Sequence, residues 1–149
     1  MLKRTLFTNA AGEANFIPLT RPCESAEQAA SLSSEALNAL EQPMDLVILG
    51  MGNDMHTASL FPDAPELGNA MDPAQQQRCL ALQPASSEHA RLSMSLNMLL
   101  NSREIILLIT GQEKQDTLQE ALKCESIEKA PIAAILQQSK VPVHIYWSP

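Results

Sequence analysis

His56 and Asp54 are the residues whose types and spacing best suit proton-transfer chemistry, because they lie two positions apart in a glycine-containing turn, residues 50–56. A histidine accepts and donates protons near neutral pH, so His56 is the candidate general base and acid, although a capping or packing histidine would fit the same turn. Asp54 would orient His56 or cap a following helix, and both interpretations stay open. The backbone N–H groups around Gly50 and Gly52 would stabilise an oxyanion, unless the glycines only suit a turn from strand to helix.

The turn follows residues 45–49, an apolar run typical of a strand buried on both faces of a parallel sheet. It therefore lies at the carboxyl end of a strand, where α/β proteins bind ligands. After the turn we expect one short helical turn, whose N-terminus would favour negative charge. Gly50 and Gly52 fit two positions of the dinucleotide motif GxGxxG. Met55 occupies the third and Pro62 soon ends any helix, so a dinucleotide site is disfavoured.

Apolar patterns along the chain predict strands alternating with helices, and hence an α/β fold with a mostly parallel sheet. Ser25 and Gln28 resemble a capping box at the start of one helix. Polar residues 63–84 predict a long surface excursion that holds one short strand. The expected strands are residues 15–19, 45–49, 79–82, 92–96, 104–110 and 141–147. The expected helices are residues 25–40, 112–123 and 130–138, and residues 2–8 would be the end of another helix.

Composition narrows the function classes. The 149 residues, 45% of them hydrophobic, suit one globular domain, residues 1–149. A net charge of −7 disfavours partnership with nucleic acid or an anionic membrane. The chain shows neither a signal peptide nor a membrane-length apolar run, so we expect a cytoplasmic protein. Three scattered cysteines without a CxxC motif support neither a disulfide framework nor a zinc site. His89 and His144 receive no role.

Taken whole, residues 50–62 resemble the signature of the 6-phosphogluconolactonases, approximately G-x-G-x-D-G-H-x-A-S-L-F-P. This family belongs to the glucosamine-6-phosphate isomerase/6-phosphogluconolactonase superfamily. The match falls at Gly50, Gly52, Asp54, His56 and residues 58–62. Residues 91–97 (RLSMSLN) resemble the family's R-[IL]-[ST]-x-[ST] strand, and residues 107–114 (LLITGQEK) resemble its strand–T-G-x-x-K element. The resemblance is strong from residue 45 onwards and looser over residues 2–41.

The resemblance implies a three-layer α/β domain with a mostly parallel sheet, without the family's N-terminal third, because its S-G-G-S-T-P loop and D-E-R segment do not occur here. It implies hydrolysis of a small sugar-phosphate lactone, 6-phospho-D-glucono-1,5-lactone, in the oxidative pentose phosphate pathway, without metal or cofactor. His56 and Asp54 would be catalytic. The substrate-binding residues would be Gly50, Gly52, Asn53, Arg91 and Lys114, the last two as phosphate ligands unless they are ordinary surface cations.

Two alternatives stay open: a glucosamine-6-phosphate isomerase or deaminase, and a truncated relative that binds sugar phosphate without turnover. Met55 stands where the family has glycine, so a positive φ there would cost about 1–2 kcal/mol. We expect Met55→Gly to raise turnover. A sheet without its first strands would expose apolar edges, which predicts self-association.

Overall fold

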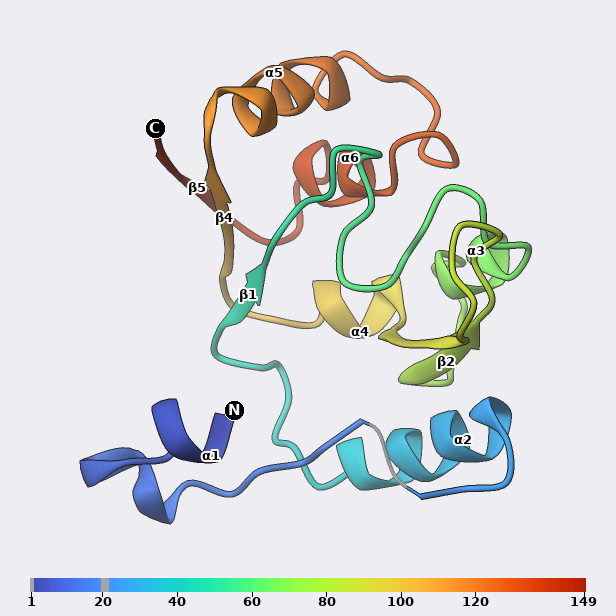
Figure 1. Ribbon diagram of the computed structural model, residues 1–149, viewed down its shortest axis with the longest axis vertical. Coiled ribbons are helices and arrows are strands. Elements are labelled where there is room, and N and C mark those ends of the chain that lie inside the picture. Colours follow the sequence, from blue (N-terminus) through green and yellow to red (C-terminus); the bar gives the residue numbers. More distant parts are fainter. Residues whose placement is uncertain (1, 20–21) are drawn as a thin grey trace.

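The computed structural model describes residues 2–19 and 22–149 (Figure 1). In chain order the elements are α1 (Leu2–Thr5), η1 (Asn9–Glu13), α2 (Ala26–Leu37), β1 (Val47–Leu49), α3 (Leu67–Ala70), β2 (Cys79–Leu82), β3 (Arg91–Met94), α4 (Leu96–Leu100), β4 (Ile105–Thr110), α5 (Gln112–Ala121), α6 (Pro131–Leu136) and β5 (Val143–Ser148). No helix within these described residues is long and apolar enough to cross a membrane.

The principal sheet is parallel, with the strand order β1-β4-β5. Val47 pairs with Ile105, and Ile105 pairs with Val143, so the three apolar segments predicted as strands lie in register. Parallel strands need crossover connections, which the helices of the chain provide. The expected α/β fold with a parallel sheet is therefore confirmed. Figure 1 shows β1, β4 and β5 beside α5 and α6, with α2 at the opposite end of the molecule.

A second, two-stranded sheet pairs β2 with β3 in antiparallel fashion. Helix α2 packs against it, and the Ser34 hydroxyl lies 2.8 Å from the N–H and 3.0 Å from the carbonyl oxygen of Cys79. The start of α2 is the predicted cap, because the Ser25 side chain accepts from the Gln28 N–H at 3.2 Å. The Gln28 side chain in turn accepts from the Glu24 N–H.

The hydrophobic core lies on one face of the parallel sheet. Odd-numbered strand residues such as Leu49, Leu107 and Ile109 are buried there with residues of α5 and α6. The expectation that β1 is buried on both faces is wrong, because Ile48 is 60% exposed on the other face. Leu108 and Tyr146 share that face, since alternate strand residues point the same way, and are 50% and 58% exposed.

Three local predictions also fail. Residues 15–19 form no strand, because they pair with no neighbour. Residues 63–84 hold the expected short strand as β2, but they are not a surface excursion throughout, since Leu67 and Ala70 of α3 are buried in the core. The alternating pattern through Leu96 breaks at Ser95, whose side chain accepts from the Met98 N–H and so starts α4 instead of continuing β3.

Candidate active site

The candidate site is the loop of residues 50–60, which leaves the carboxyl end of β1 and closes on itself through short-range hydrogen bonds. The Gly52 N–H donates to the His56 carbonyl oxygen at 2.9 Å, and the Met55 N–H donates to the Gly52 carbonyl at 3.0 Å. The Thr57 hydroxyl donates to the Gly50 carbonyl oxygen at 2.9 Å. These bonds fold residues 52–56 into a tight turn that presents His56 beyond the end of the sheet.

His56 and Asp54 form a close pair at the top of this turn. The Asp54 Oδ1 atom lies 2.5 Å from His56 Nδ1 and also accepts the His56 backbone N–H at 3.2 Å. Since an ionised carboxylate only accepts, the pair places a proton on Nδ1. The His56 side chain is 28% exposed, so the imidazole is supported by its neighbours yet reachable from solvent.

Phe61 holds the imidazole from the side. Its ring stacks on His56 with a centroid separation of 4.0 Å and an interplanar angle of 24°. A stacked aromatic ring restricts rotation of the imidazole about its side-chain bonds. The sequence resemblance included Phe61 but assigned it no role, because the contact depends on how the chain bends between residues 56 and 61.

The close pairing of His56 and Asp54 requires a glycine at position 52. A Cβ atom at this position would lie 2.2 Å from both Asp54 Oδ1 and His56 Nδ1. The two functional side chains therefore occupy the volume that any other residue would fill. Because the Gly52 N–H is bonded to the His56 carbonyl oxygen, it is not free to stabilise an oxyanion.

The loop is anchored to two distant elements. The Met55 carbonyl oxygen accepts the Ile132 N–H of α6 at 3.1 Å, and the Ser59 N–H donates to the Ser93 hydroxyl of β3 at 3.2 Å. Met55 adopts φ 65° and Ala58 adopts φ 51°, both in the left-handed region that non-glycine residues avoid. Position 55, where the family has glycine, therefore does have a positive φ, and here a methionine adopts it.

The helical turn expected after Gly50 does not form; residues 57–60 make a β-bridge turn between Thr57 and Leu60 instead. The next helix, α3, begins at Leu67. The N-cap interpretation of Asp54 is therefore wrong, and its side chain engages His56. Helix α5, whose first turn carries the pocket-lining residue Lys114, begins after Gly111 at φ 84°.

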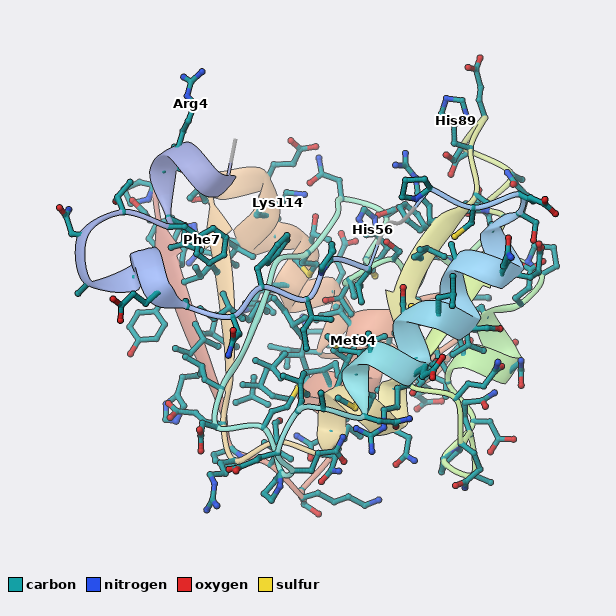
Figure 2. All side chains as sticks on the ribbon, turned by 90° about the horizontal axis from the view of Figure 1, so that it is seen from below. Arg4, Phe7, His56, His89, Met94 and Lys114 are labelled. Atoms are coloured by element: carbon teal, nitrogen blue, oxygen red, sulfur yellow. The ribbon has the colours of Figure 1, made fainter. Side chains whose placement is uncertain are left out.

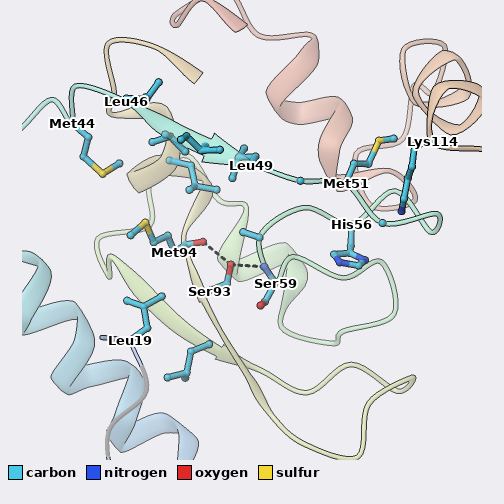
Figure 3. Close-up of a pocket in the computed structure, with 17 residues that line it drawn as sticks. Leu19, Met44, Leu46, Leu49, Met51, His56, Ser59, Ser93, Met94 and Lys114 are labelled. Carbon is cyan, nitrogen blue, oxygen red and sulfur yellow. Dashed lines mark hydrogen bonds between the residues drawn. The ribbon is translucent and has the colours of Figure 1, made fainter. Parts of the chain in front are cut away.

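A pocket of about 740 Å³ opens beside the loop (Figure 3). Its lining includes Gly50 and Gly52. Figure 3 shows His56 and Lys114 at one end of it, with Ser59 and Ser93 toward the middle. Lys114 lies in the first turn of α5 and extends toward the loop that carries His56 (Figure 3). Within the described residues Lys114 makes no ion pair, so its ammonium group is available to an anion.

The remaining predicted site residues lie outside this pocket. Arg91 begins β3 beside the lining residue Leu92, but its own side chain is exposed and does not line the pocket. Asn53 and Asp54 are exposed at the rim of the turn. His89 projects away from His56 near the start of β3, as Figure 2 shows. The structure thus brings His56 and Lys114 to one cavity, whereas Arg91 is not among the residues that line it.

One carboxyl group next to the loop has a shifted pKa. The Asp63 carboxylate accepts the Ser86 N–H at 2.7 Å. Hydrogen bonding by Ser86, assisted by the positive charge that His56 can carry, lowers the pKa of Asp63 below its ordinary value. Within the described residues no cluster of three or more His, Cys, Asp or Glu side chains could hold a metal ion.

Comparison with known families decides the membership of the chain. The model of the family described as glucosamine-6-phosphate isomerases/6-phosphogluconolactonase matches residues 1–147. The chain belongs to this family. The resemblance seen in residues 50–62 is therefore confirmed for nearly the whole sequence.

Individual members of the glucosamine-6-phosphate isomerase/6-phosphogluconolactonase family support this assignment. The chain is 40% identical to the 6-phosphogluconolactonase of Pseudomonas aeruginosa and 41% identical to that of Pseudomonas putida, over 149 residues in both cases. These matches cover the whole of this chain but 61% and 60% of the relatives. The chain thus spans about three fifths of the length of the curated relatives it matches.

Solved structures agree with the family fold. The crystal structure of a 6-phosphogluconolactonase from Shewanella baltica superposes with a TM-score of 0.95 at 38% identity, covering 99% of this chain and 63% of that one. A monomeric glucosamine-6-phosphate deaminase superposes with a TM-score of 0.61 at 20% identity and shows the shared fold alone.

Proposed function

We propose that the chain carries the catalytic site of a cytoplasmic 6-phosphogluconolactonase, which hydrolyses 6-phospho-D-glucono-1,5-lactone to 6-phosphogluconate in the oxidative pentose phosphate pathway without a cofactor. The observation that carries the proposal is the shared pocket: an imidazole oriented by a carboxylate and a free lysine ammonium line the same end of it. The chain's 40% identity to the Pseudomonas aeruginosa 6-phosphogluconolactonase supports this substrate.

In the first step His56 acts as general base. Asp54 holds the proton on Nδ1, so Nε2 is the nitrogen that accepts a proton from water. As the water oxygen bonds to C1 of the lactone, the carbonyl π electrons move to its oxygen, and the imidazole becomes imidazolium. Asp54 stabilises that charge. Gly50 and Met51 line the pocket, and in this proposal their backbone N–H groups stabilise the oxyanion.

In the second step the same imidazolium acts as general acid. When the tetrahedral intermediate collapses, the bond between C1 and the ring oxygen breaks, and the proton on Nε2 passes to that oxygen. The ring opens to the carboxylic acid, and His56 returns to its neutral form. One imidazole therefore serves both steps, and positioned proton transfer of this kind contributes about 10²–10⁴ in rate.

The phosphate would lie at the Lys114 end of the pocket. Lys114 occupies the first turn of α5, where the helix dipole repels a cation and attracts an anion. A phosphate there gains both the ammonium group and the positive end of the helix dipole. Asn53 and Arg91 are outer ligands in this proposal, since both lie outside the cavity itself.

The test is a coupled assay with 6-phosphogluconolactone, run beside glucosamine 6-phosphate. His56→Ala should reduce the rate above the spontaneous background by at least about 10²-fold. His89→Ala is the matched control, because His89 is exposed and outside the pocket, and it should leave the rate unchanged. Equal rates for the parent chain and His56→Ala would remove His56 from the mechanism. Turnover of glucosamine 6-phosphate without turnover of the lactone would favour the isomerase or deaminase alternative.

A further inference from the structure

Helix α5 contributes to the pocket through a single side chain. Among the residues that the structure describes, Lys114 is the one member of α5 that lines the cavity. A lysine side chain is long and flexible, so the backbone at its base decides where the ammonium group can reach. That backbone is joined to the sheet by one residue, Gly111, because β4 ends at Thr110 and α5 begins at Gln112.

Gly111 has a backbone conformation that it cannot hold by itself. Its φ of 84° and ψ of 157° lie in a region that is essentially restricted to glycine. Glycine also loses more conformational freedom on folding than any other residue. Since it has no side chain to pack or to cap α5, contacts from another segment are needed to hold this joint.

Two consecutive residues of β5 supply those contacts. The Gly111 N–H donates to the Ser148 carbonyl oxygen at 2.8 Å. The Trp147 indole N–H donates to the Gly111 carbonyl oxygen at 3.0 Å. The N–H and the carbonyl belong to the two peptide planes on either side of the Gly111 Cα atom. Because φ and ψ rotate these planes about that atom, the two hydrogen bonds together restrain both angles.

The parallel register of the sheet brings Trp147 to this place. Trp147 pairs with Ile109, so its side chain lies on the same face of the sheet as the buried Ile109 side chain. Leu118 of α5 belongs to the core on that face. Figure 1 shows the end of β5 close to the connection between β4 and α5. The indole therefore reaches the start of α5 from the neighbouring strand.

The indole bond is the part of this arrangement that depends on a side chain. The Gly111 carbonyl oxygen also accepts the Gln115 N–H, the first backbone bond of α5, at 3.3 Å. The bond from Trp147 is the shorter of the two. The first turn of a helix orders several residues for one hydrogen bond, so an additional bond at its first carbonyl group matters there.

We propose that Trp147 is a positioning residue for Lys114. Its indole N–H holds Gly111, and Gly111 sets the direction in which α5 leaves the sheet. The first turn of α5 then directs the Lys114 side chain toward the loop that carries His56 (Figure 3). Trp147 does not line the pocket, so it acts through Lys114. The proposal rests on the proposed function only in taking Lys114 as the group that binds phosphate.

The alternative is that Trp147 only covers the end of the sheet beside Ile109. A covering role depends on the ring and not on its N–H group. A variant that keeps an aromatic ring but lacks the indole N–H would then bind anions as the parent chain does. The two interpretations therefore differ in what the loss of one N–H group does to the pocket.

The test is Trp147→Phe, which keeps an aromatic ring and removes the indole N–H. Tyr146→Phe is the matched control, because it removes a polar atom from the next residue of β5, which is 58% exposed on the opposite face. An NMR titration with inorganic phosphate measures affinity without turnover. Trp147→Phe should raise the Kd for phosphate about threefold, within the range that one net hydrogen bond supports. Tyr146→Phe should leave the Kd unchanged.

The decisive readout is the coupling between Trp147 and Lys114. Once Lys114→Gln has removed the cation, Trp147→Phe should cause no further loss of phosphate affinity, because no ammonium group is left to position. Independent effects would instead multiply. An equal loss in both backgrounds, no loss in either, or a parent chain that binds no phosphate would each overturn the proposal.

Amide hydrogen exchange separates a local change from a general loss of stability. In Trp147→Phe the Gly111 amide should exchange about threefold faster, because its joint is less restrained. The Val47 amide, which bonds to the Glu104 carbonyl oxygen at the other end of the sheet order, should be unchanged. A Gly111 amide with the exchange rate of the parent chain would also contradict the proposal.

Phosphate binding involves no lactone, so the proposal and the proposed function can fail separately. Coupling between Trp147 and Lys114 in a chain without turnover would support the positioning role and count against the lactonase mechanism. Lactone turnover with independent effects of the two substitutions would do the reverse.

Discussion

The carboxyl end of β1 and its outer edge differ in how their polar groups are satisfied. At its carboxyl end the chain folds into a loop whose polar groups bond to near neighbours, as in the Gly52–His56 and Thr57–Gly50 pairs. Along its outer edge, Leu46 and Ile48 face a cavity and solvent. The comparison teaches that the geometry of the candidate site is built locally, whereas the outer edge of β1 has no strand beside it among the described residues.

The physical reason is the range of the interactions. A turn of five residues satisfies its hydrogen bonds within itself, with little loop-closure entropy. A strand edge and a sheet face can be satisfied only by another strand or helix, however distant in sequence. The closed loop and the open edge should therefore respond differently to substitution, and variants at Gly52 and Met55 test the closed loop.

The largest effect should come from filling the closed loop. In Gly52→Ala the new Cβ would meet the Asp54 and His56 side chains at 2.2 Å, so the pair must separate. Displacement of about 1 Å at a catalytic group costs on the order of 10² in rate, and we expect at least that loss in the lactone assay. Gly68→Ala is the control, because a Cβ at Gly68 meets nothing within 4 Å. Unchanged activity in Gly52→Ala would show that the loop is not closed as described.

Because Cys79 of β2 is buried, the free energy of unfolding should fall at alkaline pH. Burial raises the pKa of the Cys79 thiol from 9.0 to about 11. Between those pH values the unfolded chain loses the proton that the folded chain keeps, so stability is intact below pH 9 and falls as the pH rises to about 11. One pKa unit corresponds to about 1.4 kcal/mol, so the loss should be about 2–3 kcal/mol.

Urea unfolding at pH 8 and pH 11 measures this change in the free energy of unfolding. Cys79→Ala should remove most of the alkaline loss, whereas Cys23→Ala, at a half-buried cysteine, should retain it. A parent chain that is equally stable at both pH values would show that the interior around β2 is not sealed from solvent.

A substitution at Lys114, on the first turn of α5, should change KM more than kcat. Lys114→Gln removes the ammonium group that lines the pocket with His56. A hydrogen bond to a charged group contributes about 1.5–3 kcal/mol, so KM should rise about tenfold or more with little change in kcat. Lys123→Gln removes an exposed lysine just beyond the same helix and should leave KM unchanged. A fall in kcat alone would place Lys114 in the chemical step rather than at the phosphate.

The smallest effect concerns the strained residue of the loop. Met55 adopts φ 65°, so glycine should suit its backbone better than alanine, the reverse of the usual order. Met55→Gly should be more stable than Met55→Ala by about 1 kcal/mol in urea unfolding, and its turnover should exceed that of the parent chain. The comparison with alanine controls for the packing that the methionine side chain loses in both variants. An alanine variant as stable as the glycine variant would argue against strain at this position.

Much of the architecture was predictable because its signals are short-range. The apolar runs of β1 and β4, the Ser25 cap of α2 and the glycine-rich loop each depend on neighbours within a few residues. The failures share the opposite cause. Residues 15–19 have the composition of a strand but pair with no strand among the described residues, and α3 lies in a polar stretch yet packs into the core.

The candidate site divides in the same way. The sequence identified His56, Asp54 and the glycines, since their spacing forms one turn. It left the role of Asp54 open, because choosing between a helix cap and a histidine partner requires the path of the chain after residue 56. The stacking of Phe61 and the anchoring of Met55 to Ile132 depend on that path as well.

By itself, the sequence determined the family, the parallel α/β class and the identity of the turn that presents the imidazole. Only the tertiary structure decided that Lys114 shares a cavity with His56, that Arg91 lies outside it, and that β1 is the edge strand among residues 2–19 and 22–149. The reason is that residue type and spacing encode local conformation, whereas a cavity or an edge exists only once segments far apart in the chain have packed.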